Sequence, residues 1–350
     1  MRAISDVVKP GVVSGADMKY ILDYAKTEGF AIPAVNIVDS NTINAVLETA
    51  RVVNSPVFIQ ITEEGARFYA GLGLMYSDSD SLVLGAVAAA RHVHLMAQAY
   101  GVRVILQTNR ISRGSLHWVD GLLLADEKYF QENGKPLFSS HAFDLSDEPF
   151  SRNMEVLKRY FEQMGKLGQF LEAEAAYSCN SDGNTIFIQP DCINKFYEVL
   201  HPISSNFLVS VTLAVNYFET IRGQNNSLSE NLKSSQEYIQ MKQGLFDHNP
   251  VRFALYWKKN LPFEEFVKTK GLGVVKINID TYTDWAEWDG IRKYEFLNHD
   301  HLQSEKGCVE AKNGKVIKLY DPRLWLRRSQ ESVVVRLKQV YNDFDCVNRN

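Results

Sequence analysis

Apolar residues recur along the chain in short β-rich runs that alternate with longer segments of helical periodicity. The short runs lie at residues 32–38, 56–62, 102–108, 136–143, 169–175, 207–215, 252–257 and 273–280. Between them, helical spacing of apolar residues is found at 40–53, 80–101, 149–168, 191–203, 227–245 and 283–297. Many of these segments begin after Asp or Ser and close on Gly, as helix capping favours. The pattern predicts eight strands that alternate with helices.

The predicted strands are nearly continuous in apolar residues, which is typical of a parallel sheet covered on both faces. Eight of them with intervening helices favour a (β/α)8 barrel with extra C-terminal helices. We expect one domain over residues 1–350, with an N-terminal cap at 1–30 and a helical tail at 320–350 that packs on the barrel or on a second subunit. A doubly wound open sheet is the alternative, but no GxGxxG turn follows the first predicted strand.

Polar residues stand at the carboxyl ends of the predicted strands, where barrels of this class carry their functional groups. In chain order they are Asn36, Gln60, Thr62, Asn109, Arg110, Ser140, His141, Glu172, Glu174, Asn216, Tyr217, Tyr256, Lys258, Lys259, Asn278 and Asp280. The set is rich in tyrosine, lysine and amide side chains and poor in histidine.

Composition excludes several other classes of function. The net charge of −4, with 45% hydrophobic and 23% charged residues, is that of an ordinary globular protein and favours neither nucleic acid nor an anionic membrane as partner. No apolar run reaches the length of about 18 residues that a membrane span needs, and the N-terminus does not resemble a signal peptide. Four cysteines without CxxC spacing favour a reducing, cytoplasmic location.

Four stretches of the sequence carry a family resemblance: "FAIPAVNIVDSNTINAVLETA", "GKPLFSSHAFDLS", "GVVKINIDTYTDWAEWDGI" and "YDPRLWLR". They resemble segments of the class II fructose-1,6-bisphosphate aldolases, which are zinc-dependent. The similarity extends from "VKPGVVSG" to the C-terminal segment. It implies a (β/α)8 barrel, a homodimer, a small phosphorylated metabolite as substrate and a role as a lyase of carbohydrate metabolism.

The resemblance also implies a divalent metal, held by three imidazoles, that polarises the substrate ketone and stabilises the enediolate. At the matching positions this sequence has Arg110 in "QTNR", Tyr217 in "VNYF" and Tyr256 in "YWKKNL". Asn109 stands where the family has an aspartate that serves the aldehyde. A phenol loses its proton only at about pH 10, and a guanidinium cannot bind a cation. We therefore expect neither a metal nor another cofactor.

The substrate end of the site matches the family better. The resemblance implies substrate contacts for Asn36, Asn278 and Asp280, and a phosphate contact across the dimer for Arg323. Glu174 matches a carboxylate close to the metal. The family's glycine-rich phosphate loop is replaced by "WKKNL", in which Lys258 or Lys259 would bind an anion as a point charge. The substrate-binding candidates are thus Asn36, Thr62, Lys259, Asn278, Asp280 and Arg323.

Each catalytic candidate has a structural alternative. Arg110 either pairs with Glu172 or Glu174, which share one face of their strand, or stabilises an enolate. The two tyrosines either fill the core or move protons. Lys258 and Lys259 are either solvated or desolvated beside a cation, in which case a lowered pKa would permit a Schiff base.

Three functions remain open at this point. The main hypothesis is a repurposed, metal-independent, aldolase-like carbon–carbon lyase that acts on a phosphorylated or carboxylated carbonyl metabolite. Its catalytic candidates are Asn109, Arg110, Glu174, Tyr217, Tyr256 and Lys258. The first alternative is a catalytically inactive protein that binds a sugar phosphate or accompanies an active aldolase. The second alternative is a fructose-bisphosphate aldolase.

Overall fold

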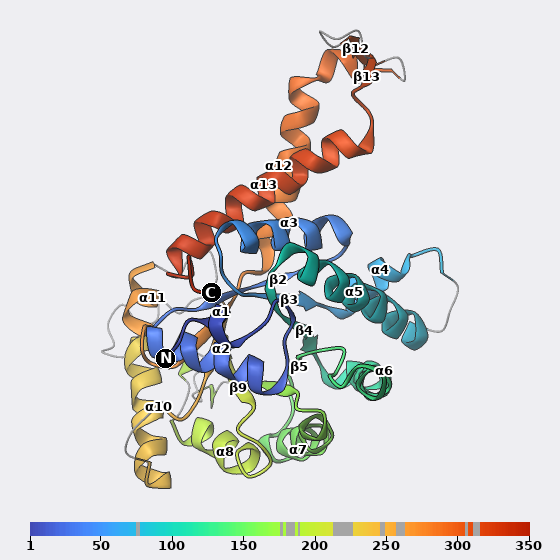
Figure 1. The fold of residues 1–350 in the computed structure, drawn as a ribbon. Coiled ribbons are helices and arrows are strands. Elements are labelled where there is room, and N and C mark those ends of the chain that lie inside the picture. The colour runs from blue at the N-terminus through green and yellow to red at the C-terminus, as the bar shows by residue number, and fades with distance from the viewer. Residues whose placement is uncertain are drawn as a thin grey trace.

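Eight parallel strands close into a barrel, and their order around the ring follows the chain (Figure 1). The strands are β2 (Ile32–Asn36), β3 (Val57–Ile61), β4 (Arg103–Ile111), β5 (Ser140–Phe143), β6 (Phe170–Glu174), β9 (Phe207–Thr212), β10 (Phe253–Tyr256) and β11 (Val274–Asn278). Pairing of β11 with β2 closes the ring. The predicted (β/α)8 barrel is confirmed, and the open-sheet alternative is wrong because these eight strands leave no edge.

This computed structural model describes residues 1–350 except 75–77, 176–177, 180–185, 188–189, 213–226, 246–248, 257–262, 305–306 and 311–315. Short elements within the described part are α1 (Ile4–Val7), β1 (Gly11–Val12), η1 (Arg113–Ser115), β7 (Ser178–Cys179), β8 (Ile186–Phe187) and η2 (His299–His301). Strand β1 pairs in parallel with the beginning of β4. It thereby ties the N-terminus to the barrel.

Amphipathic helices form the outer layer. They are α2 (Gly15–Glu28), α3 (Ser40–Val52), α4 (Glu63–Ala70), α5 (Asp78–Tyr100), α6 (Leu116–Asn133), α7 (Phe150–Lys166), α8 (Pro190–Leu200), α10 (Leu228–Gln243) and α11 (Phe263–Thr269). Six of the helices expected from periodicity lie where predicted within a few residues. The periodicity did not identify α2, α4, α6 or α11, of which α4 and α11 are short.

Helix α5 packs closely on both of its neighbours, and two glycines permit the approach. A Cβ at Gly85 would lie 1.9 Å from the carbonyl oxygen of Ala66 in α4, and a Cβ at Gly121 of α6 would lie 2.5 Å from a methyl of Val83. Residues Asp80–Tyr100 are long and apolar enough to cross a membrane by length and composition alone. Because α5 packs against α4 and α6, that apolar character serves the outer layer of the barrel.

Two helices leave the barrel as an arm (Figure 1). It consists of α12 (Asp280–Leu297) and α13 (Pro322–Asp343), with the antiparallel strands β12 (Cys308–Glu310) and β13 (Val316–Lys318) at its tip. Arg327 of α13 bonds Glu48 of α3 at 2.6 Å, which ties the arm to the barrel. The predicted terminal helix is therefore α13, which packs on both α12 and α3. The single-domain assignment with its cap and tail stays a prediction.

The barrel interior contains a buried polar layer. Lys276 of β11 donates from Nζ to Glu172 Oε2 of β6 and to Gln107 Oε1 of β4, both at 2.6 Å. Gln107 Nε2 donates to the same Glu172 oxygen at 3.0 Å, and Gln60 Nε2 of β3 donates to Gln107 Oε1 at 2.8 Å. The side chains of Lys276 and Glu172 are 0% and 1% exposed. This network supports the residues two positions further along the same strands, which form the barrel mouth.

Candidate active site at the barrel mouth

A pocket of about 390 Å³ opens at the carboxyl ends of the strands. Its lining residues are Asn36, Thr62, Glu63, Glu64, Asn109, Arg110, Ser112, Ser115 and Tyr256. They come from the ends of β2, β3, β4 and β10, from the start of α4 and from the turn before α6. Five of them, Asn36, Thr62, Asn109, Arg110 and Tyr256, were predicted from the strand ends, and the structure brings these five together in one pocket.

Asn109 of β4 is hydrogen-bonded to residues of two other strands, β2 and β10, across the pocket floor. Its side chain is 2% exposed, and its Nδ2 donates to Asn36 Oδ1 at 3.2 Å. The Tyr256 hydroxyl donates to Asn109 Oδ1 at 3.1 Å. An amide accepts or donates hydrogen bonds but has no proton to transfer near neutral pH. Asn109 is therefore suited to orient a substrate and the Tyr256 hydroxyl, and Tyr256 is the proton-bearing group of this trio.

Arg110 lies above this floor as a fixed cation. Its Nε donates to Asp144 Oδ2 at 2.5 Å, and its Cζ lies 5.2 Å from the centroid of the Tyr256 ring. Burial lowers the pKa of the guanidinium, but Asp144, the Tyr256 phenol and Glu174 together raise it above its ordinary value. Arg110 therefore remains charged at any physiological pH.

The carboxylate that pairs with Arg110 is Asp144, and the alternative that pairs it with Glu172 or Glu174 was wrong. Glu172 is held by Lys276, and Glu174 accepts from the Ser210 hydroxyl at 2.6 Å. The register of β4 against β5 shifts between Thr108 and Ile111, so simple alternation along the strand does not give the direction of Arg110. Asp144 follows β5 directly, and its backbone N–H bonds the carbonyl of Ile111, which holds its carboxylate beside Arg110.

Asn278 lies at the end of β11, in register with Tyr256 of β10. Neighbouring residues in register on parallel strands share a face, so the Asn278 side chain points to the barrel axis as Tyr256 does. It is fully buried, and neither its Oδ1 nor its Nδ2 has a hydrogen-bond partner among the described residues. An unpaired buried amide costs about 1–3 kcal/mol, which a bound polar ligand would recover.

For four candidates the structure gives no side-chain position, and a fifth lies away from this pocket. Tyr217, Lys258 and Lys259 lie outside the described residues, and so does the side chain of Asp280, the first residue of α12. Arg323 lies in the arm, where it pairs with Asp321 at 2.6 Å and has an 88% exposed side chain. That pairing lowers the pKa of Asp321 to about 2.

His141 was a pocket candidate, and this was wrong. Its ring lies between the strands and α6, where it bonds Thr108 Oγ1 at 2.8 Å and Asp126 Oδ2 at 3.0 Å. The side chain is fully buried. The neighbouring residues of β5, Ser140 and Ala142, lie in register with Gln107 and Glu172 on the inner face, so alternation turns His141 outward.

Five polar residues of the site were not singled out from the sequence: Glu63, Glu64, Ser112, Ser115 and Asp144. Glu63 accepts a short hydrogen bond from the Ser115 hydroxyl, and its carboxylate lies 3.8 Å from Arg67. Ser112 and Ser115 lie 3.2 Å apart. Asp144, Glu63 and Ser112 each come within two residues of a strand end, so a stricter reading of the strand ends would have found them.

The described lining does not fit a zinc ion. Arg110 has no lone pair to give and places a positive charge in the pocket. Tyr256 uses its hydroxyl as a donor to Asn109, and Asp144 is engaged by Arg110. Within the described ranges, no group of three His, Cys, Asp or Glu side chains could hold a metal. Because Tyr217 lies outside those ranges, the absence of a metal stays a prediction.

The fold and the pocket define a (β/α)8-barrel protein whose polar site lies at the strand ends, the arrangement that barrel enzymes use. Residues 16–349 match the family "Fructose-bisphosphate aldolase class-II". The chain is 40% identical to fructose-bisphosphate aldolase of Campylobacter jejuni (strain NCTC 11168) and 41% identical to that of Haemophilus influenzae, with 99% of each chain covered. A crystal structure of the Campylobacter jejuni aldolase covers 100% of this chain and 99% of its own, with a TM-score of 0.88 and 40% identity. The chain belongs to the class II fructose-bisphosphate aldolase family.

Proposed function

We propose that this protein is an aldolase-type carbon–carbon lyase of the cytoplasm that acts on a phosphorylated ketose without a metal ion at the barrel mouth. The observation that carries the proposal is the position of Arg110. Its guanidinium is fixed by Asp144, faces Tyr256 and stands at the position that the family resemblance gives to a metal-binding histidine. A preorganised cation of this kind stabilises negative charge that develops on a substrate oxygen.

In a retro-aldol cleavage, the bond between the α and β carbons of the ketose breaks. Its electron pair forms an enolate on the ketone fragment, and the β-hydroxyl loses its proton as the aldehyde forms. Arg110 would stabilise the enolate oxygen, and a tyrosine, Tyr256 or Tyr217, would relay the proton from the β-hydroxyl to the α-carbon of the enolate, so that an aldehyde and a ketone leave. Asn36, Asn109 and Asn278 would hold the substrate's hydroxyl groups. The phosphate would be held by Lys258 or Lys259.

A second candidate function has support of its own. Curated relatives that are about 40% identical over nearly their whole length bear the name fructose-bisphosphate aldolase. Cleavage of fructose 1,6-bisphosphate is therefore the competing activity. Against a metal-dependent form of it stand Arg110, Tyr217 and Tyr256, since a guanidinium and two phenols are poor zinc ligands near neutral pH.

Metal dependence separates the two candidates. We expect the protein to exchange an α-proton of dihydroxyacetone phosphate for deuterium in D₂O, and we expect the rate to be unchanged by a chelator or by added zinc. Exchange is followed by NMR, and cleavage of fructose 1,6-bisphosphate is assayed in parallel. Chelator-sensitive cleavage that zinc restores would establish the second candidate. Absence of exchange in both states would leave a protein that only binds a sugar phosphate.

A Schiff base would also proceed without a metal, so the mechanism needs its own control. Borohydride reduction in the presence of dihydroxyacetone phosphate traps an imine as a stable adduct. The electrostatic mechanism predicts no adduct at Lys258 or Lys259. An adduct there would assign the chemistry to lysine.

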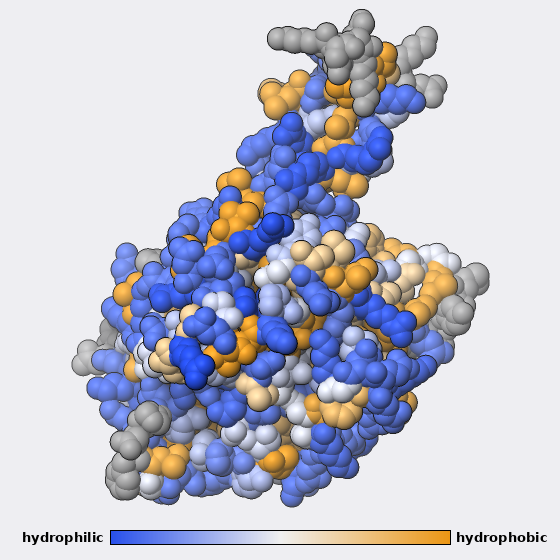
Figure 2. All heavy atoms as spheres, viewed as in Figure 1, coloured by the Kyte–Doolittle hydropathy of each residue, from blue (hydrophilic) through white to orange (hydrophobic). Residues whose placement is uncertain are grey.

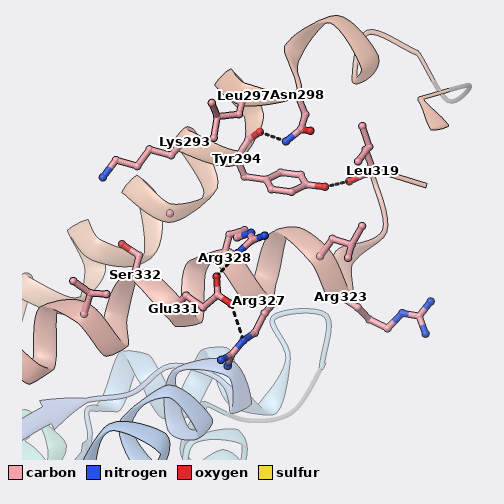
Figure 3. Close-up of a pocket in the computed structure, with 13 residues that line it drawn as sticks. Lys293, Tyr294, Leu297, Asn298, Leu319, Arg323, Arg327, Arg328, Glu331 and Ser332 are labelled. Atoms are coloured by element: carbon pink, nitrogen blue, oxygen red, sulfur yellow. Dashed lines mark hydrogen bonds and ion pairs between the residues drawn. The ribbon is translucent and has the colours of Figure 1, made fainter. Parts of the chain in front are cut away.

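We further propose that the protein is a homodimer joined through its arm. The arm exposes Trp285, Trp288, Phe296, Leu297 and Val335, with side chains between 55% and 79% exposed. Figure 2 shows hydrophobic residues among the hydrophilic ones along the arm. A cleft of about 780 Å³ lies between α12 and α13, and Figure 3 shows Arg323 pointing away from the arm at its rim. An apolar surface of this kind on a projecting element is typical of an interface.

Charged substitutions on this surface should separate the subunits. We expect Leu297→Asp combined with Val335→Asp to convert a dimer to a monomer at micromolar concentration, because each carboxylate would have to be buried. Sedimentation velocity measures the change. Leu124→Asp, on the exposed face of α6 with 68% exposure, is the matched control and should leave the dimer intact. A wild-type protein that sediments as a monomer would end this proposal.

A further inference from the structure

The pocket rim formed by α4 is acidic. Glu63 and Glu64 are the first two residues of that helix, and both line the pocket. Glu63 is bonded to Ser115 and lies near Arg67. Glu64 is exposed and has no hydrogen-bond or ion-pair partner among the described residues. The Glu64 carboxylate is therefore available to bind a ligand at the opening of the pocket.

The start of α4 is also closed to an anion. Helix N-termini attract phosphates because their first backbone N–H groups are unpaired and the helix dipole is positive there. Here Thr62 Oγ1 accepts from the Gly65 N–H at 3.0 Å, and two carboxylates occupy the first turn. A phosphate at this rim would meet negative charge in place of free donors.

The described cations near this rim leave Glu64 uncompensated, since Arg67 lies 3.8 Å from Glu63. Arg110 is the cation among the described lining residues, and Asp144 already pairs with it. Arg323, to which the family resemblance gives a phosphate contact across the dimer, lies in the arm and pairs with Asp321 at 2.6 Å. No described residue therefore supplies Glu64 with a counter-charge.

A ligand is indicated independently by Asn278, which lies between strands β10 and β2, whose end residues Tyr256 and Asn36 line the pocket. Asn278 is fully buried, points to the barrel axis and has both amide atoms unpaired within the described structure. A substrate that satisfies this amide would extend from the axis towards α4. Its outer end would then meet Glu63, Glu64 and the two serines, which together offer mainly hydrogen-bond acceptors.

We infer that the end of the substrate over α4 carries hydroxyl or amino groups and no phosphate, so that the substrate is a ketose monophosphate. This inference rests on the proposed function, because it assigns a substrate class to the same site. The two carboxylates would accept hydrogen bonds from the sugar's terminal hydroxyls or from an ammonium. A second phosphate would be repelled by the same groups. The acidic rim thereby limits the substrate to one phosphate group.

Binding of substrate-like alcohols without a carbonyl tests the inference separately from catalysis. Hexitol 1-phosphate and hexitol 1,6-bisphosphate are titrated by calorimetry at low ionic strength. We expect the monophosphate to bind at least about tenfold more tightly than the bisphosphate. This ratio of the two affinities should decrease as salt is added. A 1-amino-1-deoxyhexitol 6-phosphate, compared with the simple monophosphate, tells an ammonium preference from a hydroxyl preference.

Variants at the rim give the matched comparison. Glu64→Gln should reduce the preference for the monophosphate over the bisphosphate. Glu64→Lys should make the bisphosphate the tighter ligand. Glu132→Lys makes the same charge change at the far, exposed end of α6 and should leave the ratio unchanged. A bisphosphate that binds the wild type as tightly as the monophosphate would overturn the inference, as would failure of both to bind. Deuterium exchange of dihydroxyacetone phosphate reports on the proposed function separately, so either idea can fail alone.

Discussion

Replacing Lys276 by methionine is expected to lower the free energy of unfolding by about 3–5 kcal/mol, because it leaves a buried carboxylate without its counter-charge. Lys276 and Glu172 are 0% and 1% exposed, and their charged atoms lie 2.6 Å apart. Gln107 donates to the oxygen that Lys276 binds, and the other oxygen of Glu172 has no partner within the described ranges, so Gln107 would be the one described partner left to the carboxylate. Equilibrium denaturation in urea at fixed protein concentration measures the loss.

Two comparisons isolate the buried pair. Lys276→Met combined with Glu172→Leu removes both charges and should recover most of the loss, since paired apolar replacements are often neutral. Lys233→Met breaks the pair of Lys233 with Glu237, whose side chains are 65% and 61% exposed, and should cost less than about 1 kcal/mol. If Lys276→Met were no more destabilising than Lys233→Met, the buried pair would not stabilise the barrel interior as proposed.

The second large effect is expected at Arg110. Arg110→Met should lower the rate of deuterium exchange into dihydroxyacetone phosphate by about a hundredfold to a thousandfold, as loss of a preorganised charge does in other enzymes. The effect should fall on the maximal rate more than on apparent affinity, because the negative charge develops in the transition state. NMR under saturating substrate makes the measurement.

Three further variants give this prediction its controls. Arg110→Lys keeps the charge but loses the planar contact with Asp144, so a partial loss is expected. Asp144→Asn removes the carboxylate that holds the Arg110 guanidinium in place. The exchange rate should therefore fall because Arg110 loses its fixed position. Arg113→Met changes a more exposed arginine of the next turn, 4.0 Å from Glu148, and should have little effect. Equal activity in Arg110→Met and the wild type would remove Arg110 from the mechanism.

Much of the site followed from one rule about strand ends. Asn36, Thr62, Asn109, Arg110 and Tyr256 were predicted to share a site, and the pocket brings them together. Their partners did not follow. The pairing of Arg110 with Asp144 depends on a register shift in β4, and the outward turn of His141 depends on the face of β5 that meets α6. Neither feature can be predicted from the residues that are adjacent in the sequence.

The alternation of apolar runs and helical segments determined the eight strands, because a strand buried on both faces leaves a continuous apolar signal whatever lies around it. The sequence also shows directly that Arg110, Asn109 and two tyrosines stand at the positions that match active-site residues of the family. Only the tertiary structure decided that α12 and α13 project as an arm, since periodicity shows that a helix has an apolar face and not what covers it. It also decided that Glu63 and Glu64 face the pocket, because their direction is set by the start of α4 and not by their spacing in the chain.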